Sequence, residues 1–496
     1  MKRSVRNFIG GSWVDSATGG TFESVNPADT AETVATVAKS SCADVDNAVN
    51  AAREAFRRWR LTPAPKRGEI LFSAGEILAG RKHELGELLT REMGKVLPEA
   101  LGDVQEAIDM SYYMAGEGRR LAGETIPSEL PDKDCKSVRV PVGVCAIITP
   151  WNFPVAIPAW KLMPALVSGN TVVFKPSSYT PACAAMLVGI LGEAGLPAGV
   201  VNFVNGSGEE TGDYLASHDG IDAISFTGST AVGLGIAKTA AEKGKKVSCE
   251  MGGKNAIIIM DDADLALALE GAIWGGFGTS GQRCTSSSRL VVHRAVYDRF
   301  LDMFSAAAKK MRLGNGLDGK TDVGPVINAH QMERILKYIG VGTEEGAKLV
   351  TGGKACREGV CGRGYFIEPT IFSEVTPEMR IAREEIFGPV VSVIRAEDLD
   401  DAIRIVNGTP YGLVSSIYTG DVNKSAIAER ELDTGIVYIN SSTIGAEVQL
   451  PFGGTKRSGF GHEEAGGRGG GLDMFTKWKV VYRDFSGRLQ KAQIDR

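Results

Sequence analysis

The chain has few of the features that mark metal proteins, disulfide scaffolds or membrane proteins. Its five histidines show no HExxH or similar spacing, so we expect no metal site. Its eight cysteines show neither a CxxC pair nor the density of a disulfide framework. The longest apolar runs, such as residues 256–260, are far too short to span a bilayer, and residues 1–8 do not resemble a secretory signal. These absences predict a cytoplasmic location.

An excess of charge of one sign is also absent. The net charge is −5, with lysine and arginine scattered along the chain, so nothing favours binding to nucleic acid or to an anionic membrane. A hydrophobic content of 43% and a charged content of 23% are those of an ordinary soluble globular protein. At 496 residues the chain exceeds the size at which a single core stops growing. We therefore expect two or more domains.

Two of the cysteines, Cys356 and Cys361, lie in a polar, glycine-rich stretch. They could pair on oxidation. We instead expect a surface loop that carries two free thiols.

From Gly143 onward, short apolar segments alternate with amphipathic stretches such as 180–194. The predicted strands are 144–149, 171–175, 200–204, 222–227 and 246–250. This alternation predicts βαβ units and a parallel sheet, in which ligands bind beyond the carboxyl ends of the strands. The residues that follow three of these strands, at 150–152, 175–178 and 227–229, should therefore share one rim.

The flanking regions have patterns of their own. A helical stripe begins at Val45, with Ser41 and Asp44 placed as a capping box. A second alternating region begins near Asn255 and predicts a separate α/β domain. Residues 137–140 and 472–482 each indicate a strand, and an exposed strand of this kind invites pairing with another chain.

Cys284 and Glu250 are the residues that most directly indicate a reaction. Cys284 lies in the segment Gly281-Gln282-Arg283-Cys284-Thr285, and Glu250 precedes it by 284 − 250 = 34 positions. A thiolate attacks carbonyl carbon well, and a carboxylate can act as a general base. A single cysteine is more often a small core residue, but the flanking glycines and the glutamate favour catalysis.

The segments around these two residues resemble the signature segments of the NAD(P)-dependent aldehyde dehydrogenase superfamily. The match runs from Phe8-Ile9-Gly10-Gly11-Ser12-Trp13 to Pro451-Phe452-Gly453-Gly454. The resemblance implies an α/β fold with a Rossmann-type NAD(P)-binding domain, an α/β catalytic domain and a small β oligomerisation arm that makes homodimers or homotetramers. The expected boundaries are 1–122 and 142–252 for the first, 253–454 for the second, and 123–141 with 471–490 for the arm.

The expected cofactor is NADP, NAD or both. The segment 226–230 closes a strand and opens a helix, whose N-terminus offers unpaired N–H groups to a pyrophosphate. Gly206-Ser207-Gly208 is followed by Gly212, one position late for a GxGxxG fingerprint. The resemblance implies cofactor contacts from Thr149, Pro150, Trp151, Lys175, Ser177, Ser178, Gly208, Gly212, Phe226, Gly228, Ser229, Met251, Glu385 and Phe387.

Ser178 bears on the choice between the two cofactors. Many NAD-preferring relatives carry a glutamate three places after the lysine that matches Lys175. Such a carboxylate binds the ribose hydroxyls and repels a 2′-phosphate. Because Ser178 is small and neutral, we expect NADP to be accepted well, with NAD still usable.

The resemblance also assigns catalytic roles. Attack of Cys284 on an aldehyde gives a thiohemiacetal, whose oxyanion needs donors fixed in advance, and Asn152 with the Cys284 N–H is expected to supply them. After hydride transfer, Glu250 is expected to be the base for the water that hydrolyses the thioester. Lys161 is expected to assist electrostatically. Relatives that acylate coenzyme A generally lack this base, so Glu250 predicts a free acid as product.

The implied aldehyde tunnel is lined by Phe153, Trp160, Arg283, Thr285 and Phe452, with Gln105, Asp109 and Tyr112 on a neighbouring helix. Arg283 is either a fork for a substrate carboxylate or a structural arginine that pairs within its loop, and both interpretations stay open. Segments 115–118, 153–158 and 445–451 resemble those of α-ketoglutaric semialdehyde (2,5-dioxovalerate) dehydrogenases. We therefore expect a short acidic semialdehyde, with succinic and glutaric semialdehydes as close alternatives.

Other readings remain. The chain could oxidise a broad range of aliphatic aldehydes or be a non-phosphorylating glyceraldehyde-3-phosphate dehydrogenase, which would need a basic pocket at the tunnel mouth. A non-catalytic scaffold protein would have no reason to keep the thiol, the base and the amide together.

Overall fold

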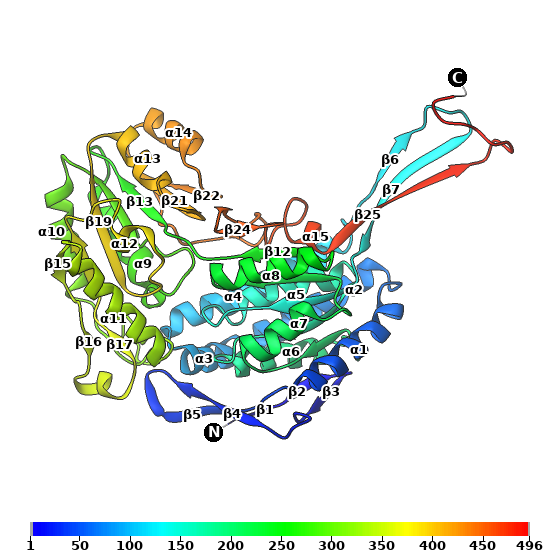
Figure 1. Cartoon of the computed structure of the whole chain (residues 1–496), viewed down its shortest axis with the longest axis horizontal. Helices are drawn as coiled ribbons and strands as arrows, with labels where there is room; N and C mark the ends of the chain where they lie inside the picture. The colour runs from blue at the N-terminus through cyan, green and yellow to red at the C-terminus, as the bar shows by residue number, and fades with distance from the viewer. Residues whose placement is uncertain (1–2, 495–496) are drawn as a thin grey trace.

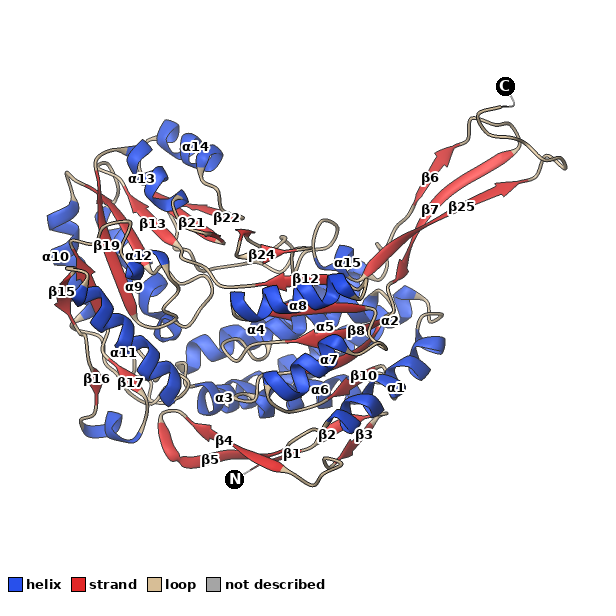
Figure 2. Cartoon of the chain, in the orientation of Figure 1, coloured by secondary structure: helices blue, strands red, loops and turns tan. Residues whose placement is uncertain are grey.

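Two large sheets and a slender arm define the shape of the molecule. The computed structural model describes residues 3–494, and it shows a broad body from which the arm projects (Figures 1 and 2). The body holds an eight-stranded and a seven-stranded sheet, each packed against helices. The expected α/β fold with a Rossmann-type parallel sheet is confirmed.

The first sheet is built on five parallel strands in the order β12–β11–β8–β9–β10. Their bounds are Val144–Ile148 (β8), Thr171–Lys175 (β9), Val201–Phe203 (β10), Ala223–Thr227 (β11) and Lys246–Glu250 (β12). Each lies within the strand expected from the sequence. Antiparallel strands extend the two edges: β24 (Gly459–Phe460) next to β12, and β2 (Asn7–Ile9) with β3 (Ser12–Val14) beyond β10.

Successive side chains of these strands face two different cores, as a sheet buried on both sides requires. Val144, Ala146 and Ile148 face α1, α7 and α8, whereas Cys145 and Ile147 face α2, α4, α5 and α6. The helices of this half are α1 (Cys42–Trp59), α2 (Ala64–Gly80), α3 (Lys82–Met93), α4 (Leu97–Glu117), α5 (Ala156–Val167), α6 (Pro181–Glu193), α7 (Asp213–Ser217) and α8 (Thr230–Glu242). The capping box of Ser41 and Asp44 at the start of α1 is confirmed.

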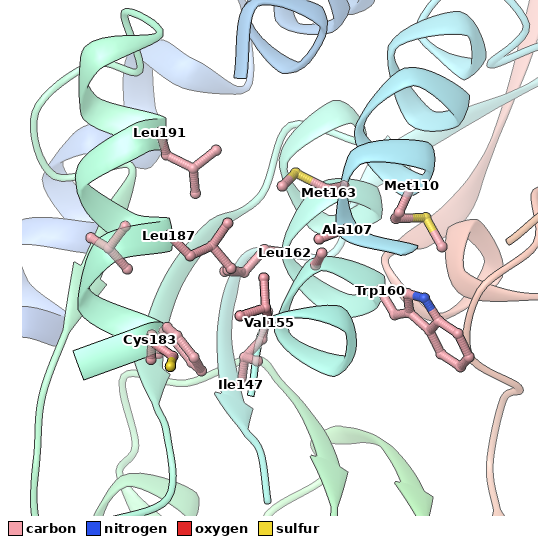
Figure 3. Close-up of a cluster of buried hydrophobic side chains, with 14 of the residues drawn as sticks. Ala107, Met110, Ile147, Val155, Trp160, Leu162, Met163, Cys183, Leu187 and Leu191 are labelled. Carbon is pink, nitrogen blue, oxygen red and sulfur yellow. The ribbon is translucent and has the colours of Figure 1, made fainter. Parts of the chain in front are cut away.

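The larger of the two cores lies between α4, α5 and α6. In Figure 3, Leu162 and Met163 of α5 gather with Leu187 of α6 and Ala107 of α4. Complete burial of a leucine or methionine contributes roughly 1.5–3 kcal/mol. Trp160, on the same α5, lies at the edge of this cluster, so the packing fixes the helix that also carries part of the site.

The second sheet has the order β15–β18–β19–β14–β13–β21–β22, with only β15 antiparallel to its neighbour. Helices α9 and α10 cover one face, and α11, α13 and α14 cover the other. The strands are β13 (Ala256–Ile259), β14 (Arg289–His293), β15 (Lys348–Thr351), β18 (Thr370–Ser373), β19 (Val390–Ala396), β21 (Val414–Tyr418) and β22 (Ile436–Ile439). The helices are α9 (Leu265–Phe277), α10 (Tyr297–Ala308), α11 (Ala329–Glu344), α12 (Arg380–Arg383), α13 (Leu399–Asn407) and α14 (Val422–Glu431).

Three small sheets join these parts. One is formed by β1 (Arg3–Val5), β4 (Thr21–Asn26) and β5 (Asp29–Ala38), another by β16 (Ala355–Cys356) and β17 (Phe366–Ile367), and a third by β20 (Tyr411–Gly412) and β23 (Thr455–Lys456). Cys361 lies in the turn between β16 and β17, but it is buried against Ala28 and Phe366. The expectation of an exposed loop is therefore wrong for Cys361, because this turn packs on the β4–β5 hairpin region; both thiols are free.

The arm is an antiparallel sheet of β6 (Glu124–Pro127), β7 (Lys133–Pro141) and β25 (Thr476–Asp484), as Figure 1 shows. Both expected arm strands, near 137–140 and within 472–482, are found. The residues just before β25 were expected to belong to the arm strand, but they form a helix on the body. Helix α15 (Gly471–Met474) is buried against α5 and β12, so the arm leaves the body only at Thr476.

Within residues 3–494, no helix has the length and apolar composition that crossing a membrane requires.

Candidate active site

The loop that carries Cys284 has an unusual backbone. Thr279, Ser280 and Gly281 all adopt left-handed conformations, with φ values of 52°, 56° and 66°. Non-glycine residues in this region cost free energy and persist only where neighbours hold them. At Gly281 a Cβ atom would lie 2.2 Å from the carbonyl oxygen of Gly388, so a larger residue would not fit.

Glu99, in the first turn of α4, holds this loop in place. Its carboxylate accepts hydrogen bonds from the N–H and Oγ1 of Thr279 at 3.0 Å and pairs with Arg283 at 3.1 Å. Asn255 fixes the loop from the other side, because its Nδ2 donates to the carbonyl oxygen of Cys284 at 2.6 Å. Neither residue was singled out from the sequence. An acid in the first turn of a helix is ordinarily explained by its favourable interaction with the helix dipole.

Cys284 lies where two cavities meet, since it lines both of them. Burial, together with the carboxyl groups of Glu385, Glu250 and Glu464, raises the pKa of its thiol to about 12. A hydrogen bond from the Thr285 N–H acts in the opposite direction. The resting side chain is therefore a thiol, and it needs a base to become a nucleophile.

Glu250 ends β12 and lines the smaller cavity together with Cys284. Burial, followed by the carboxyl group of Glu464, raises its pKa well above the ordinary value, while Lys161 lowers it. Its Oε2 has no hydrogen-bond partner among residues 3–494. A buried carboxyl oxygen without a partner is uncommon and indicates a place for a water or ligand atom.

Lys161 is occupied by other groups. Its ammonium forms an ion pair with Glu464 and donates to Ser225 Oγ at 2.8 Å, and Thr227 Oγ1 donates to the same Glu464 at 2.6 Å. Lys161 is 1% exposed and is absent from the residues that line the smaller cavity. Glu464, which does line it, was missed because it lies 303 positions further along the chain.

Asn152 follows β8 and is buried next to the nucleophile loop. Its Nδ2 donates to the carbonyl oxygen of Gln282 at 3.1 Å, which leaves its second amide hydrogen for another acceptor. The backbone N–H of Cys284 makes no hydrogen bond within the described chain. Two donors therefore lie beside the thiol.

The larger cavity, of about 620 Å³, opens at the carboxyl ends of β8, β9 and β11. It brings together all the expected cofactor residues except one: Thr149, Pro150, Trp151, Lys175, Ser177, Ser178, Gly208, Phe226, Gly228, Ser229, Met251, Glu385 and Phe387. Sequence reasoning did not anticipate that Glu209, Val232, Gln331 and Arg334 also line it.

Gly212 is the exception. It is buried, and a Cβ atom there would lie 3.5 Å from Cδ of Lys175, so it lies behind that side chain. Residues Gly208–Gly212 form a π-helical turn in which the Gly212 N–H donates to the carbonyl oxygen of Ser207 at 3.2 Å. This wider turn accommodates one extra residue. The π-helical turn therefore explains why Gly212 stands one position later than the GxGxxG fingerprint requires. The cofactor contact expected of Gly212 is wrong.

The larger cavity suits a dinucleotide. At Gly252 a Cβ atom would lie 2.2 Å from a carboxyl oxygen of Glu385, so the backbone approaches this carboxylate closely. Glu385 also accepts the Gly253 N–H at 3.1 Å, and burial raises its pKa. Thr149 Oγ1 is buried without a partner in residues 3–494, and burial lowers the pKa of Lys175 to about 8. The residues present can thus hold ribose hydroxyls at two ends of one cavity.

The smaller cavity, of about 60 Å³, leads from Cys284 toward solvent along α4 and α5. The expected residues Phe153, Trp160, Arg283, Thr285 and Phe452 line it, and the rings of Trp160 and Phe452 lie 5.1 Å apart. Gln105 does not line it, because its side chain bonds Lys82 and Asp109. The α4 residue that faces the cavity is the next one, Glu106. The expected contacts of Gln105, Asp109 and Tyr112 are corrected accordingly; Tyr112 bonds Glu76.

Arg283 has contacts of both expected kinds. Its Nε donates to Thr279 Oγ1 at 2.9 Å and its guanidinium pairs with Glu99, as a structural arginine would. It also lines the smaller cavity and lies over the Phe153 ring at 5.2 Å. Because Glu99 already compensates its charge, Arg283 by itself is a weaker carboxylate anchor than an unpaired arginine would be.

Comparison with known proteins agrees with this geometry. The chain matches the model of the aldehyde dehydrogenase family over residues 13–481. It is 43% identical to an α-ketoglutaric semialdehyde dehydrogenase of Bacillus subtilis (strain 168), over 96% of this chain and 97% of that one. It is 44% identical to an α-ketoglutarate semialdehyde dehydrogenase of Haloferax volcanii, over 97% and 99% of the two chains.

Solved structures agree as well. A betaine aldehyde dehydrogenase from Staphylococcus aureus in complex with NAD⁺ superposes with a TM-score of 0.95 at 36% identity, covering 98% of this chain and 96% of that one. An aldehyde dehydrogenase-like protein from Burkholderia cenocepacia gives the same TM-score and identity, covering 99% of each chain. The chain is an enzyme, and it belongs to the aldehyde dehydrogenase family.

Proposed function

We propose that this enzyme oxidises a short acidic semialdehyde, such as α-ketoglutaric semialdehyde (2,5-dioxovalerate) or succinic semialdehyde, to the free acid. The observation that carries the reaction is the meeting of Cys284 and Glu250 at one small cavity, with an unpartnered oxygen on Glu250. The substrate class is supported by relatives at 43–44% identity whose names specify this semialdehyde.

In the first half of the reaction, the Cys284 thiol passes its proton to Glu250, which lines the same cavity, and the Cys284 sulfur attacks the aldehyde carbon. The Asn152 amide and the Cys284 N–H stabilise the oxyanion of the thiohemiacetal that forms. Removing one such donor typically costs ~100- to 1000-fold in rate. Bound NAD(P)⁺ supplies the hydride acceptor for this enzyme's chemistry. Glu385 and Lys175 would hold its two ribose units, and Trp151 packs against Phe387 with the ring centroids 5.4 Å apart.

In the second half, Glu250 takes a proton from the water that attacks the Cys284 thioester. Its raised pKa makes it a stronger base than an ordinary glutamate once it is ionised. Lys161 does not reach the smaller cavity directly; it holds Glu464, which lies beside Glu250. Glu464 and Lys161 thereby set the charge around the base.

A small cavity supports a short substrate, and its aromatic walls leave a second candidate. Phe153, Trp160 and Phe452 would equally suit a short uncharged aldehyde, so broad aliphatic activity is the alternative. The arm supports the further proposals of a homodimer or homotetramer. Trp478, Val480 and Tyr482 leave 50%, 58% and 67% of their surfaces exposed on one face of β25. The domain boundaries and a cytoplasmic location remain predictions.

The test is the initial rate of NAD(P)H formation with succinic semialdehyde, 2,5-dioxovalerate, hexanal and benzaldehyde, without coenzyme A. We expect the two acidic semialdehydes to have the highest kcat/KM. Cys284→Ser should abolish activity, whereas Cys42→Ser, at an exposed thiol, should not. Glu250→Gln, which lacks the base for both halves of the reaction, should slow the first NAD(P)H formed per site and should prevent steady turnover. Higher kcat/KM for hexanal would reject the substrate class, and steady turnover by Glu250→Gln would reject the base.

A further inference from the structure

Glu106 is a carboxyl group that the mechanism does not use, placed inside the aldehyde cavity. It lies on α4 and lines the smaller cavity with Phe153, Arg283 and Cys284. No hydrogen bond or ion pair of its carboxyl group is found within residues 3–494. Glu106 is half-buried, and a polar group without a protein partner retains its capacity to bond a ligand.

The cations near Glu106 are already compensated. Lys95 is fully buried and pairs with Asp103 at 3.0 Å. Arg283 pairs with Glu99 at 3.1 Å. Two cations and two anions therefore balance locally, and an ionised Glu106 would add one uncompensated negative charge to a partly enclosed cavity with aromatic walls. Such surroundings disfavour the charged form, so the neutral acid is favoured.

The other ionisable groups around Glu106 act in both directions, and the net shift is upward. Burial and then Asp103 raise its pKa, and Asp109 does so from the next turn of α4, while Arg283 and Lys95 lower it. Burial raises the pKa of Tyr438 of β22, and the carboxyl groups of Glu447 and Glu106 raise it further.

The same cavity is also lined by the acids Glu250 and Glu464 and by the thiol of Cys284. The acids outnumber the cations in these surroundings.

We propose that Glu106, as a neutral acid, donates a hydrogen bond to an oxygen atom at the distal end of the substrate and thereby selects oxygen-tailed aldehydes over hydrocarbon ones. With Arg283 on the neighbouring wall, a tail carboxylate would receive one neutral donor and one partly compensated cation. This inference rests on the proposed function, since it concerns how the acidic semialdehyde is recognised. It adds a residue that determines specificity at the far end from the thiol.

The ionisation state of the free enzyme supports this assignment. Burial, followed by Asp103, raises the pKa of Glu106 to about 8. The carboxyl group is thus mostly protonated at neutral pH. Above pH 8 it loses the donor and gains a charge that repels an anionic tail, so affinity for the semialdehyde should fall there.

An ionised Glu106 would give the opposite specificity. A carboxylate among aromatic rings is suited to a quaternary ammonium group. The compensated charges and the excess of nearby acids favour the neutral form of Glu106. A preference for a cationic aldehyde that depends on Glu106 would therefore oppose our proposal.

The experiment compares wild type, Glu106→Gln and Glu106→Leu at pH 7 and pH 9 with saturating NADP. The substrates are succinic semialdehyde, hexanal and betaine aldehyde, and the readouts are KM and kcat measured separately. Hexanal serves as the internal control, because pH effects on Cys284, Glu250 and the cofactor site act on it equally. Circular dichroism melting checks that each variant is folded.

We expect the wild-type KM for succinic semialdehyde, relative to hexanal, to rise about tenfold from pH 7 to pH 9. Glu106→Gln, which keeps a neutral donor, should hold the pH 7 value within about threefold and remove the rise. Glu106→Leu should raise the semialdehyde KM at least tenfold with little change for hexanal.

Three results would overturn the proposal. They are equal changes for both aldehydes in Glu106→Leu, a persistent alkaline rise in Glu106→Gln, or a loss of betaine aldehyde turnover in Glu106→Gln. Failure of the proposed function is a separate result: wild type itself would then prefer hexanal at pH 7.

Discussion

The carboxylate of Glu99 accepts the backbone N–H of Thr279 at 3.0 Å, although the two residues are 180 positions apart. This bond joins the first turn of α4 to a left-handed turn that ends just before the nucleophile. A conformation that is unfavourable in isolation is therefore stabilised by an acid on a different element.

Glu99→Ala should impair both stability and activity. The change removes three hydrogen bonds to Thr279 and leaves the buried Arg283 uncompensated, so we expect a loss of about 2–4 kcal/mol in unfolding free energy. We also expect kcat to fall tenfold or more, because the turn would relax. Glu397→Gln, which breaks an exposed pair with Arg294, is the matched control and should change stability by less than about 0.5 kcal/mol. Urea unfolding and initial rates measure both.

The rate with an uncharged aldehyde should increase as pH rises above 7. Burial raises the pKa of both Glu250 and Cys284, and the reactive form of each is the deprotonated one. The fraction in the reactive form therefore grows with pH until the raised pKa values are passed. A pH–rate profile of kcat for hexanal checks this, and a profile that is flat or falling from pH 7 to 9 would contradict it.

Cofactor choice should depend on two residues at one end of the larger cavity. Ser178→Glu places a carboxylate where a 2′-phosphate would lie, so kcat/KM for NADP should fall at least tenfold while NAD is little affected. Glu209 already lines this cavity, so Glu209→Gln should improve NADP relative to NAD. Glu210→Gln is the control, since Glu210 pairs with Lys39 and does not line the cavity. An unchanged cofactor ratio in Ser178→Glu would contradict the assignment.

The arm should be needed for assembly. Val480→Asp puts a charge in the middle of the exposed apolar row of β25, and we expect a monomer by light scattering after size exclusion. Lys479→Asp changes charge on the other face of the same strand and should leave the oligomer intact. If both variants keep the oligomeric state of wild type, this face is not the interface.

The raised pKa of Glu106 should also make the stability of the folded protein depend on pH. Its folded-state pKa is raised from 4.5 to about 8, so the folded chain binds this proton more tightly than the unfolded chain. Wild type should therefore lose stability as pH rises from about 4.5 toward 8. Glu106→Gln lacks that loss, so its melting temperature relative to wild type should be higher at pH 8 than at pH 5. A gap that does not depend on pH would contradict the raised pKa.

Local sequence patterns were sufficient to predict the parallel strands and the positions of the residues that follow them. Residues 150–152, 175–178 and 227–229 could be placed on one rim because parallel strands end at the same edge of a sheet. Gln105 was predicted to face the aldehyde cavity, but Glu106 does. Neighbouring side chains on a helix differ in direction by about 100°, and sequence spacing alone does not fix which of them faces the cavity. Glu99, Asn255 and Glu464 could not be found locally, since each acts on residues far away in the chain.

The position of the two-residue strand β24 late in the chain determines when, during synthesis, the enzyme can become active. It pairs with the end of β12, so that Gly459 lies opposite Glu250, and Glu464 follows it into the site. A nascent chain would therefore have its nucleophile and base synthesised long before the segment that completes their surroundings emerges from the ribosome. Such distant contacts also close slowly. Catalysis should begin only after this segment has been made and has joined the sheet, which keeps the thiol inactive until then.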